Sequence, residues 1–275
     1  MNHIKLSVVL ATYNEESNIK DCLSSVKDIA DEIIVVDGKS VDKTAQIAQQ
    51  LGAKVISVAN NPQFHKNKQM AINSATGEWI LQLDGDERVS PELAKEIRKV
   101  INDKQNKLDA YYLPRKNWFL GRFLTKGGAY PDPVLRLFRR GKGNFTHTKI
   151  INNGITTSNV HAQIEVGGQT GRLNYNLIHY GDISFSKYLM RLNRYTQLEA
   201  ENLVLLKFKP NFLHLINYMI CKPIYWFTKR YIRHRGYVDG YQGLLFALLS
   251  AMHYPVIYLK LLEHQHQEKY VTKTK

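Results

Sequence analysis

The chain has few cysteines and lacks a long apolar segment near its start. Its 275 residues include only two cysteines, Cys22 and Cys221, which lie far apart and in no spacing typical of a metal site. We therefore expect free thiols in a reducing compartment. The first apolar run, residues 6–11, is too short for a signal peptide and is soon followed by the acidic pair Glu15 and Glu16. These features predict a cytoplasmic protein.

Acidic residues are scarce in the second part of the chain. Residues 1–100 hold 12 Lys and Arg against 14 Asp and Glu, whereas residues 101–275 hold 26 against 10. The net charge of +14 is therefore concentrated after residue 100. A basic part of this kind suits an anionic lipid surface, a phosphorylated acceptor or nucleic acid, although excess Lys and Arg can also serve solubility alone.

The first 90 residues alternate apolar runs with segments of helical periodicity. Four apolar runs have the composition of buried strands, namely residues 6–11, 32–37, 53–58 and 79–83. Three segments between them space their apolar residues as helices do, namely residues 15–29, 44–51 and 67–75. Gly52 and Gly77 are expected to end two of these helices. This alternation predicts an α/β fold, a doubly wound and mostly parallel sheet with helices on both faces.

Later segments carry weaker signals. Ser90 and Pro91 have the residue types of an N-cap and a first helical position, so a helix is expected to begin there. Residues 109–113 and 135–138 are expected to form strands. Residues 184–206 have apolar residues along one face, which predicts an amphipathic helix.

The last part of the chain combines apolar and basic residues. Residues 211–235 mix aromatic and aliphatic side chains with Lys and Arg, and residues 244–259 are uncharged and mostly apolar. A membrane-spanning helix usually needs about 20 apolar residues. Because these segments are shorter and contain Pro223 and Pro255, we favour helices that lie in a membrane interface. Packing on the rest of the protein and true spanning are the alternatives.

The strongest chemical signal is the acidic cluster Asp84-Gly85-Asp86-Glu87, which directly follows a predicted strand. Clustered carboxylates are costly unless a cation neutralises them, and Mg²⁺ or Mn²⁺ prefers such oxygen ligands together with substrate phosphates. Gly85 would allow a sharp turn and a close approach of a diphosphate. A plain turn is the alternative, since Asp-Gly is a common hairpin dipeptide.

Two further polar clusters follow neighbouring strands. Thr12-Tyr13-Asn14-Glu15 follows the first strand, and Asp37 to Thr44 follows the second. Ligands of parallel sheets bind beyond the carboxyl ends of the strands, where an acidic residue suits a base or ribose. Tyr13 could stack on a base. Each cluster alone could be explained by a turn or by core packing. Three such clusters at strand ends favour a nucleotide site with a metal ion.

These motifs resemble a known family. Residues 7–15, 34–44 and 75–87 are similar to the opening of the family 2 inverting glycosyltransferases. Residues 130–140 and 236–240 are similar to its lipopolysaccharide-core glucosyltransferase branch. The resemblance implies a GT-A fold, a UDP-sugar donor and inversion at the anomeric carbon. It places the catalytic domain at residues 1–180, with a nucleotide-sugar half at 1–100 and an acceptor half at 101–180. The basic helical region would span 181–275.

The resemblance also implies roles for the donor side of the site. It places five residues at the nucleotide, namely Thr12, Tyr13, Asn14, Glu15 and Asp37. Of these, Asp37 would contact uracil or ribose. Lys68 would lie near the nucleotide or diphosphate, although an exposed helix lysine is an equal alternative. Asp84 would face the ribose or the metal, Asp86 would be the main ligand of Mn²⁺ or Mg²⁺, and Glu87 would shape the site.

The acceptor side is less determined. An inverting displacement needs a carboxylate base within hydrogen-bond reach of the acceptor hydroxyl. Asp132 is the first candidate, with an Asx turn or acceptor binding as alternatives. Related proteins often have His-Glu where this chain has His161-Ala162, so Glu165 is the second candidate. His161 is expected to be structural or an acceptor contact, and Arg136, Arg139 and Arg140 to hold phosphates. His147 and His179 are expected to be structural.

These residues predict transfer of a sugar, with UDP-glucose as the first choice of donor. The expected acceptor is a glycolipid, such as a heptose of the lipopolysaccharide inner core, at the inner face of the cytoplasmic membrane. A different polysaccharide or lipid-linked acceptor is an alternative. A nucleotidyltransferase would instead carry a Gly-rich basic loop after the first strand. A nucleic-acid binder is not expected, because the basic residues lie in long apolar helices rather than in a recognised module.

Overall fold

The computed structural model describes residues 4–60, 65–145, 148–151, 155–158 and 164–273. It divides into two compact units. Unit 1 comprises Met1–Lys116, Pro131–His147 and Ala162–Tyr180, and unit 2 comprises Asn117–Tyr130, Thr148–His161 and Gly181–Lys275. Each unit is described by itself.

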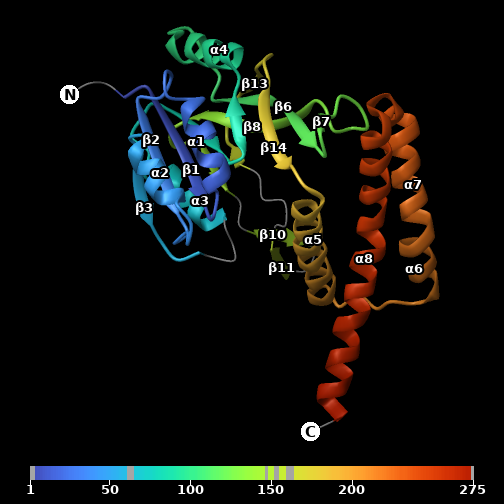
Figure 1. Ribbon diagram of the computed structural model, residues 1–275. Coiled ribbons are helices and arrows are strands. Elements are labelled where there is room, and N and C mark those ends of the chain that lie inside the picture. Colours follow the sequence, from blue (N-terminus) through green and yellow to red (C-terminus); the bar gives the residue numbers. More distant parts are fainter. Residues whose placement is uncertain (1–3, 61–64, 146–147, 152–154, 159–163, 274–275) are drawn as a thin grey trace. The chain divides into compact units, whose positions relative to one another are not determined.

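The main sheet has ten strands, and most of them belong to unit 1 (Figure 1). Its strands lie in the order β3, β2, β1, β4, β8, β6, β14 and β5, while β7 and β13 pair with β6. The first four run parallel, and β8 and β6 continue the sheet antiparallel. The strand bounds are β1 (Leu6–Thr12), β2 (Glu32–Asp37), β3 (Lys54–Ser57), β4 (Trp79–Leu83), β5 (Glu87–Val89), β6 (Ala110–Phe119), β7 (Arg122–Phe123), β8 (Asp132–Arg139), β13 (Thr170–Arg172) and β14 (Leu177–Asp182).

Helices cover both faces of this sheet because its strands are apolar on both sides. On one face, β1 and β4 pack against α1 (Glu16–Ser24), α2 (Thr44–Gln50) and α4 (Pro91–Asn102). On the other, they pack against α3 (His65–Asn73) and the hairpin of β9 (Gly143–Phe145) and β12 (Ile164–Val166). The predicted doubly wound α/β fold is confirmed. A separate small hairpin pairs β10 (Thr148–Ile151) with β11 (Ile155–Ser158).

The helix ends follow local chemistry in most places. Ser90 caps α4 by accepting a hydrogen bond from the backbone N–H of Leu93 at 3.2 Å, as predicted. Gly52 follows α2 with φ +84°, a backbone conformation that favours glycine. The prediction for Gly77 is wrong, because α3 already ends at Asn73. A Cβ at Gly77 would lie 2.7 Å from Ser7 Oγ, so glycine is required there by close packing.

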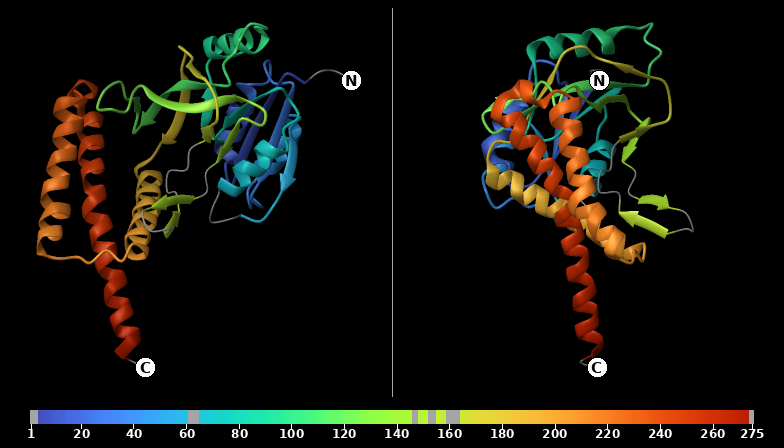
Figure 2. Two further views of the ribbon diagram at one scale, coloured as in Figure 1. Left: turned by 180° about the vertical axis from the view of Figure 1, so that it is seen from behind. Right: turned by 90° about the vertical axis from the view of Figure 1, so that its right-hand side faces the viewer.

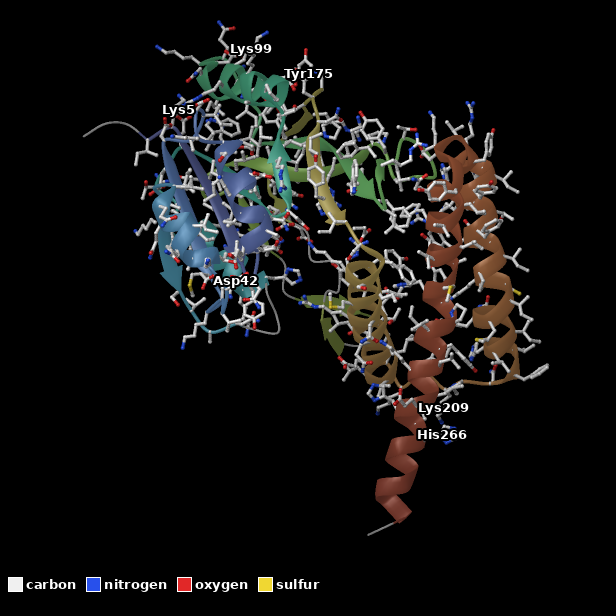
Figure 3. All side chains as sticks on the ribbon, in the orientation of Figure 1. Lys5, Asp42, Lys99, Tyr175, Lys209 and His266 are labelled. Atoms are coloured by element: carbon white, nitrogen blue, oxygen red, sulfur yellow. The ribbon has the colours of Figure 1, made fainter. Side chains whose placement is uncertain are left out.

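The strand order reverses between β1 and β4, which makes this point the switch of a doubly wound sheet. Leu10 of β1 is in register with Leu83 of β4, and Thr12 with Asp37 of β2. The carboxyl ends of these strands therefore meet at one edge. Figure 3 shows this edge at Asp42, opposite Lys5 at the start of β1.

Unit 2 is built mainly from helices. A helical segment from Phe212 to Arg233 contains α6 (Phe212–Ile216), η1 (Asn217–Cys221), α7 (Lys222–Thr228) and η2 (Lys229–Arg233). The short η3 (Gly236–Asp239) leads into α8 (Gly240–Lys273), which runs alongside α7 in both views of Figure 2. The predicted helix near 184–206 is α5 (Phe185–Leu205), which packs against α8. Buried Asp239 accepts hydrogen bonds from the backbone N–H groups of Thr125 and Lys126 at 2.9 and 2.8 Å.

The apolar C-terminal segment is longer than predicted. Pro255 lies inside α8, and the helix continues through it, so this proline does not end the segment. A proline removes one backbone donor, a loss that the packing of α8 on α5 and α7 can offset. Residues 236–266 are long and apolar enough to cross a membrane, with 28% of the most apolar window buried. A core helix of a soluble protein can have the same composition. Both cysteines are unpaired, as predicted.

Candidate active site at the carboxyl ends of the strands

The loops after β1 and β2 are joined by hydrogen bonds. The backbone N–H of Asn14 donates to Ser40 Oγ at 2.9 Å, and Asn14 Oδ1 accepts from the N–H of Val41 at 3.0 Å. Asn14 holds a left-handed backbone with φ 54°. Asp37 is buried and accepts from the backbone N–H and the hydroxyl of Ser40 at 2.9 and 2.6 Å. The two clusters predicted from the sequence therefore form one rim.

The loop after β4 lies against the same rim. A Cβ at Gly85 would be 3.1 Å from Glu15 Cγ and 3.3 Å from Glu15 Cβ. Gly85 has no positive φ, so its small size matters here for the approach of Glu15. Cys22 Sγ lies 3.5 Å from the carbonyl oxygen of Asp84, and burial raises the pKa of this thiol well above its ordinary value. All three predicted clusters thus meet at one edge of the sheet.

Two cations hold the Asp84 carboxylate. Lys68 of α3 contacts Oδ1, and Arg136 of β8 donates from Nη2 to Oδ2 at 2.7 Å. Burial raises the pKa of Asp84, but the charges of Arg136 and Lys68 outweigh it and hold this pKa well below its ordinary value. Lys68 and Arg136 are both buried, which argues against a solvent-exposed lysine at position 68.

The network extends from Asp84 to Asp132 through ion pairs that are buried at Glu87 and partly exposed at Asp132. Arg136 Nη2 also contacts Glu87 Oε1 at 2.7 Å, and Glu87 Oε1 lies 3.5 Å from Arg115 Nη1. Arg115 in turn holds Asp132 Oδ2 from Nε and Nη2 at 3.0 and 2.6 Å. Burial lowers the pKa of Arg115, but Glu87 and Asp132 more than offset it and raise this pKa above its ordinary value. Glu87 is fully buried, so its charge depends on these two guanidinium groups.

Asp86 points to a different partner. Its Oδ1 lies 3.6 Å from Nε2 of His179 on β14, while its carbonyl oxygen accepts from the backbone N–H of Tyr180 at 2.9 Å. Both side chains are half-buried. His179 is adjacent to Asp86 because β14 pairs with β5, which places His179 opposite Glu87. The sequence gives no local spacing that would have revealed this neighbour of Asp86.

The first-strand loop also presents groups suited to a ligand. Thr12 Oγ1 is buried without a hydrogen-bond partner among the described residues. An unmatched buried hydroxyl is unfavourable unless a ligand or water completes it. Tyr13 is 45% exposed at the same loop, so its ring is accessible rather than packed in the core.

The predicted residues Arg139 and Glu165 are not brought into this network. Arg139 lies opposite Trp79 at the far end of β4, where it donates to Glu78 Oε1 at 2.8 Å. Glu165 is exposed on β12, in register with Asn144 of β9. His161 and His147 lie outside the described residues. Two residues of the network were not predicted from the sequence. Arg115 holds Asp132, and Gln82 contacts Arg136.

Comparison with known proteins places the chain in a family. Residues 7–155, more than half of the chain, match the family model described as Glycosyl transferase family 2. A relative named an uncharacterized glycosyltransferase, from Rickettsia typhi, is 31% identical over 249 residues, covering 90% of this chain and 83% of that protein. The protein is a glycosyltransferase. It belongs to glycosyl transferase family 2, as the resemblance of its first 87 residues predicted.

A further relative bears on the predicted branch. The lipopolysaccharide core biosynthesis glycosyltransferase LpsC of Rhizobium meliloti is 25% identical over 259 residues, covering 90% of this chain and 91% of LpsC. The similarity to a lipopolysaccharide-core glycosyltransferase is confirmed.

Solved structures were also compared. The S. aureus TarS 1–349 structure with UDP-GlcNAc has a TM-score of 0.48 and 18% identity, covering 89% of this chain and 80% of that one. Glucosyl-3-phosphoglycerate synthase from Mycobacterium tuberculosis, with Mn²⁺ and UDP-glucose, has a TM-score of 0.34 and 22% identity, covering 43% of this chain and 44% of that one. Since both scores are below 0.5, the roles of individual residues are argued from this chain alone.

Proposed function

We propose that this protein is an inverting, metal-dependent glycosyltransferase that moves a sugar from a UDP-sugar to a hydroxyl of an envelope glycolipid. The observation that carries the proposal is the meeting of three polar clusters at the strand switch point, around the unmatched Thr12 hydroxyl and the buried Asp37. Glucose is the first choice of sugar. A lipopolysaccharide-core acceptor is favoured because LpsC is named for that process and matches nearly the whole chain.

On the donor side, we assign the base and ribose to the rim formed by the first two loops. Thr12 Oγ1 would hydrogen-bond the nucleotide, Tyr13 would stack on the base, and Asp37 would contact uracil or ribose through the loop that it anchors. Asn14 and Glu15 would line the same pocket. Lys68, beside Asp84, would place a positive charge near the diphosphate.

The residues present suit a divalent cation at Asp86. Among the described residues, no three His, Cys, Asp or Glu side chains gather as a complete metal cluster. Mg²⁺ and Mn²⁺ are commonly held by one or two protein groups together with substrate phosphates, which the pair of Asp86 and His179 would satisfy. Asp84 is less suited, because Lys68 and Arg136 occupy its two oxygens. A cation bound there supplies charge stabilisation for the leaving diphosphate.

For the acceptor side, we propose Asp132 as the base and Glu165 as the alternative. Arg115 fixes the Asp132 carboxylate from two nitrogens and joins it, through Glu87 and Arg136, to Asp84. The same pair of contacts would orient one carboxylate oxygen toward an acceptor hydroxyl. That oxygen would take the hydroxyl proton as the acceptor oxygen attacks the anomeric carbon and the bond to UDP breaks.

A membrane-held acceptor agrees with the chemistry of unit 2. Its helices combine basic residues with many exposed apolar side chains, including Phe212, Leu213 and Tyr241, each more than 65% exposed. Apolar area and positive charge together favour an anionic membrane surface. We therefore propose that the protein works at the inner face of the cytoplasmic membrane, with α6 to α8 in contact with the lipid.

The test is release of UDP from a panel of UDP-sugars, with Mn²⁺ or Mg²⁺ and a lipopolysaccharide acceptor. The Asp86→Ala variant should lose turnover by a factor on the order of 10² or more, because it removes the main metal ligand. Asp103→Ala is the matched control, since Asp103 is a carboxylate at the C-terminal cap of α4 whose side chain accepts from the backbone N–H of Gln105. No UDP release from any donor by the folded protein, or a fully active Asp86→Ala, would refute the proposal.

The two candidate bases can be separated in the same assay. Asp132→Asn and Glu165→Gln each remove a carboxylate with little change of shape. If Asp132 is the base, its variant loses kcat by a factor of about 10² to 10⁴ and Glu165→Gln retains activity. The reverse result would assign the base to Glu165. Binding of UDP should be unchanged in the inactive variant, which distinguishes a missing base from a misfolded site.

A further inference from the structure

A polar pocket lies within the apolar helices of unit 2. It has a volume of about 150 Å³ and is lined by side chains from α5, η1, α7 and α8. Its polar members are Glu199, Asn202, Tyr218, Lys222 and Tyr254. A cavity of this volume is large enough for a small group of several heavy atoms. The donor residues at the strand switch point all belong to unit 1, so this pocket is a separate feature.

Lys222 is the cation of this pocket. Its Nζ lies 3.4 Å from the centre of the Tyr218 ring, one helical turn earlier, and 5.3 Å from the centre of the Tyr254 ring. Among the described residues, no carboxylate oxygen is recorded within 4.0 Å of this ammonium group. Ring faces offset part of the cost of placing an ammonium ion among aromatic residues, but they accept no conventional hydrogen bond. The three N–H groups of Lys222 suit an anion.

The remaining polar groups of the pocket fit an anion that carries oxygen acceptors. Asn202 offers amide N–H groups, and the Tyr254 hydroxyl is a donor at neutral pH. The acidic member, Glu199, is paired with His253, whose Nε2 lies 3.0 Å from Glu199 Oε1. The imidazole therefore occupies one oxygen of the Glu199 carboxylate. A tetrahedral phosphate has the size and the acceptor atoms that this set of donors requires.

Exposed apolar side chains flank the pocket along both of its long helices. Ile220 and Ile224 lie on either side of Lys222 in sequence, with exposed fractions of 53% and 59%. On α8, Met252 and Leu259 are 52% and 53% exposed and lie near the pocket residues Tyr254 and Ile257 in sequence. A charged pocket bordered by exposed apolar side chains is the pattern expected for a group that has a phosphate head and an apolar tail.

We propose that this pocket binds the phosphate of an anionic lipid headgroup, with Lys222 as its cation and Asn202 and Tyr254 as neutral donors. The proposal rests on the membrane contact proposed above, but not on sugar transfer. A site of this kind would hold unit 2 on lipid through a specific headgroup rather than through diffuse charge alone.

The test is calorimetric titration of the purified full chain with two probes, dihexanoyl-phosphatidylglycerol and inorganic phosphate. Lys222→Met should weaken binding about tenfold or more, the effect of losing one charge-assisted hydrogen bond. Lys209→Met is the matched control, because Lys209 is an exposed lysine of the same unit outside the pocket (Figure 3). It removes the same charge and should leave the affinity within about twofold if diffuse attraction contributes little.

The outcomes decide both the pocket and the source of the phosphate. Binding of the lipid that is lost in Lys222→Met and kept in Lys209→Met supports the proposal. Binding of inorganic phosphate alone overturns the lipid headgroup, and equal losses in the two variants, or no binding of either probe, overturn the pocket. If Lys222→Met fails to fold, Lys222→Arg should retain binding and Asn202→Leu should weaken it. If the lipid binds in the pocket but no UDP is released, the result counts against the proposed transferase alone. If UDP is released but the lipid does not bind, the result counts against the pocket alone.

Discussion

Arg136 offers the sharpest test of how the site is held together. It is buried and donates to Asp84 Oδ2 and Glu87 Oε1, each at 2.7 Å, and it contacts Gln82. Arg136→Met keeps much of the side-chain volume but removes the charge. Breaking a buried ion pair by removing one partner usually costs 3–5 kcal/mol, because the remaining charge is left uncompensated.

The structure places the expected cost at the lower end of that range. Asp84 is 27% exposed at its side chain and keeps Lys68, so water and this lysine compensate part of its charge. Glu87 is fully buried. Among the described residues, its carboxylate keeps only the backbone N–H of Asp84 at 3.0 Å and Arg115 Nη1 at 3.5 Å as partners. The loss therefore falls mainly on Glu87, and we expect a decrease of about 3 kcal/mol in the free energy of unfolding.

Urea unfolding followed by circular dichroism measures this loss. With an m-value of about 3 kcal/mol/M, the midpoint should fall by about 1 M. The control is Arg98→Met, because Arg98 and its partner Asp31 are 32% and 31% exposed, so that water can replace the lost contact and the cost should be about 1 kcal/mol or less. Adding Glu87→Gln to Arg136→Met should recover about 1 kcal/mol by removing the uncompensated charge. Equal losses in the two arginine variants would refute this account of the network.

Three further predictions concern separate features. Gly85→Ala should raise the KM for the UDP-sugar several-fold, because a Cβ would lie 3.1 Å from Glu15 Cγ and displace that side chain; an unchanged KM in the UDP-release assay would contradict the contact. His179→Gln should raise the Mn²⁺ concentration for half-maximal activity about tenfold, while Asp103→Ala leaves it unchanged; equal metal requirements would remove His179 from the metal site. Asp31→Asn should destabilise the protein at pH 7 and have a smaller effect at pH 3, measured by urea unfolding at both pH values. Burial raises the Asp31 pKa, but hydrogen bonds from Leu6, Lys5 and Arg98 lower it overall, so its contribution is present above about pH 4 and is lost as the pH falls. A loss that persists unchanged at pH 3 would show that charge is not its cause.

The donor half of the site was predictable because each of its parts follows a strand. The segment 79–83 is apolar on both sides, so it had to be a buried strand, and Asp84 then had to lie at its carboxyl end. The same reasoning placed Thr12 and Asp37. Parallel strands end at one edge, so three local patterns were enough to bring these residues together without knowledge of any long-range contact.

The acceptor half was less predictable because antiparallel pairing sets its geometry. Arg136 and Arg139 have the same local surroundings in sequence, but β8 runs antiparallel to β4, which places Arg136 beside Asp84 and Arg139 beside Trp79. Arg115 reaches Asp132 because β6 pairs with β8 in a particular register. Such registers depend on contacts between distant segments, and no periodicity within either strand encodes them.

The pattern Asp84-Gly85-Asp86 changes meaning when these contacts are included. From the sequence, the two aspartates form one metal-binding pair. In the structure the turn directs them apart: Asp84 faces α3 and β8, where Lys68 and Arg136 compensate its charge, and Asp86 faces β14, where His179 is its neighbour. A carboxylate already held by two cations gains little from a third cation. The division therefore favours different tasks, with Asp84 fixing the wall of the site and Asp86 proposed as the metal ligand. A metal requirement that depends on Asp86 and His179, but is much less affected by Asp84→Asn, is the result that this division requires.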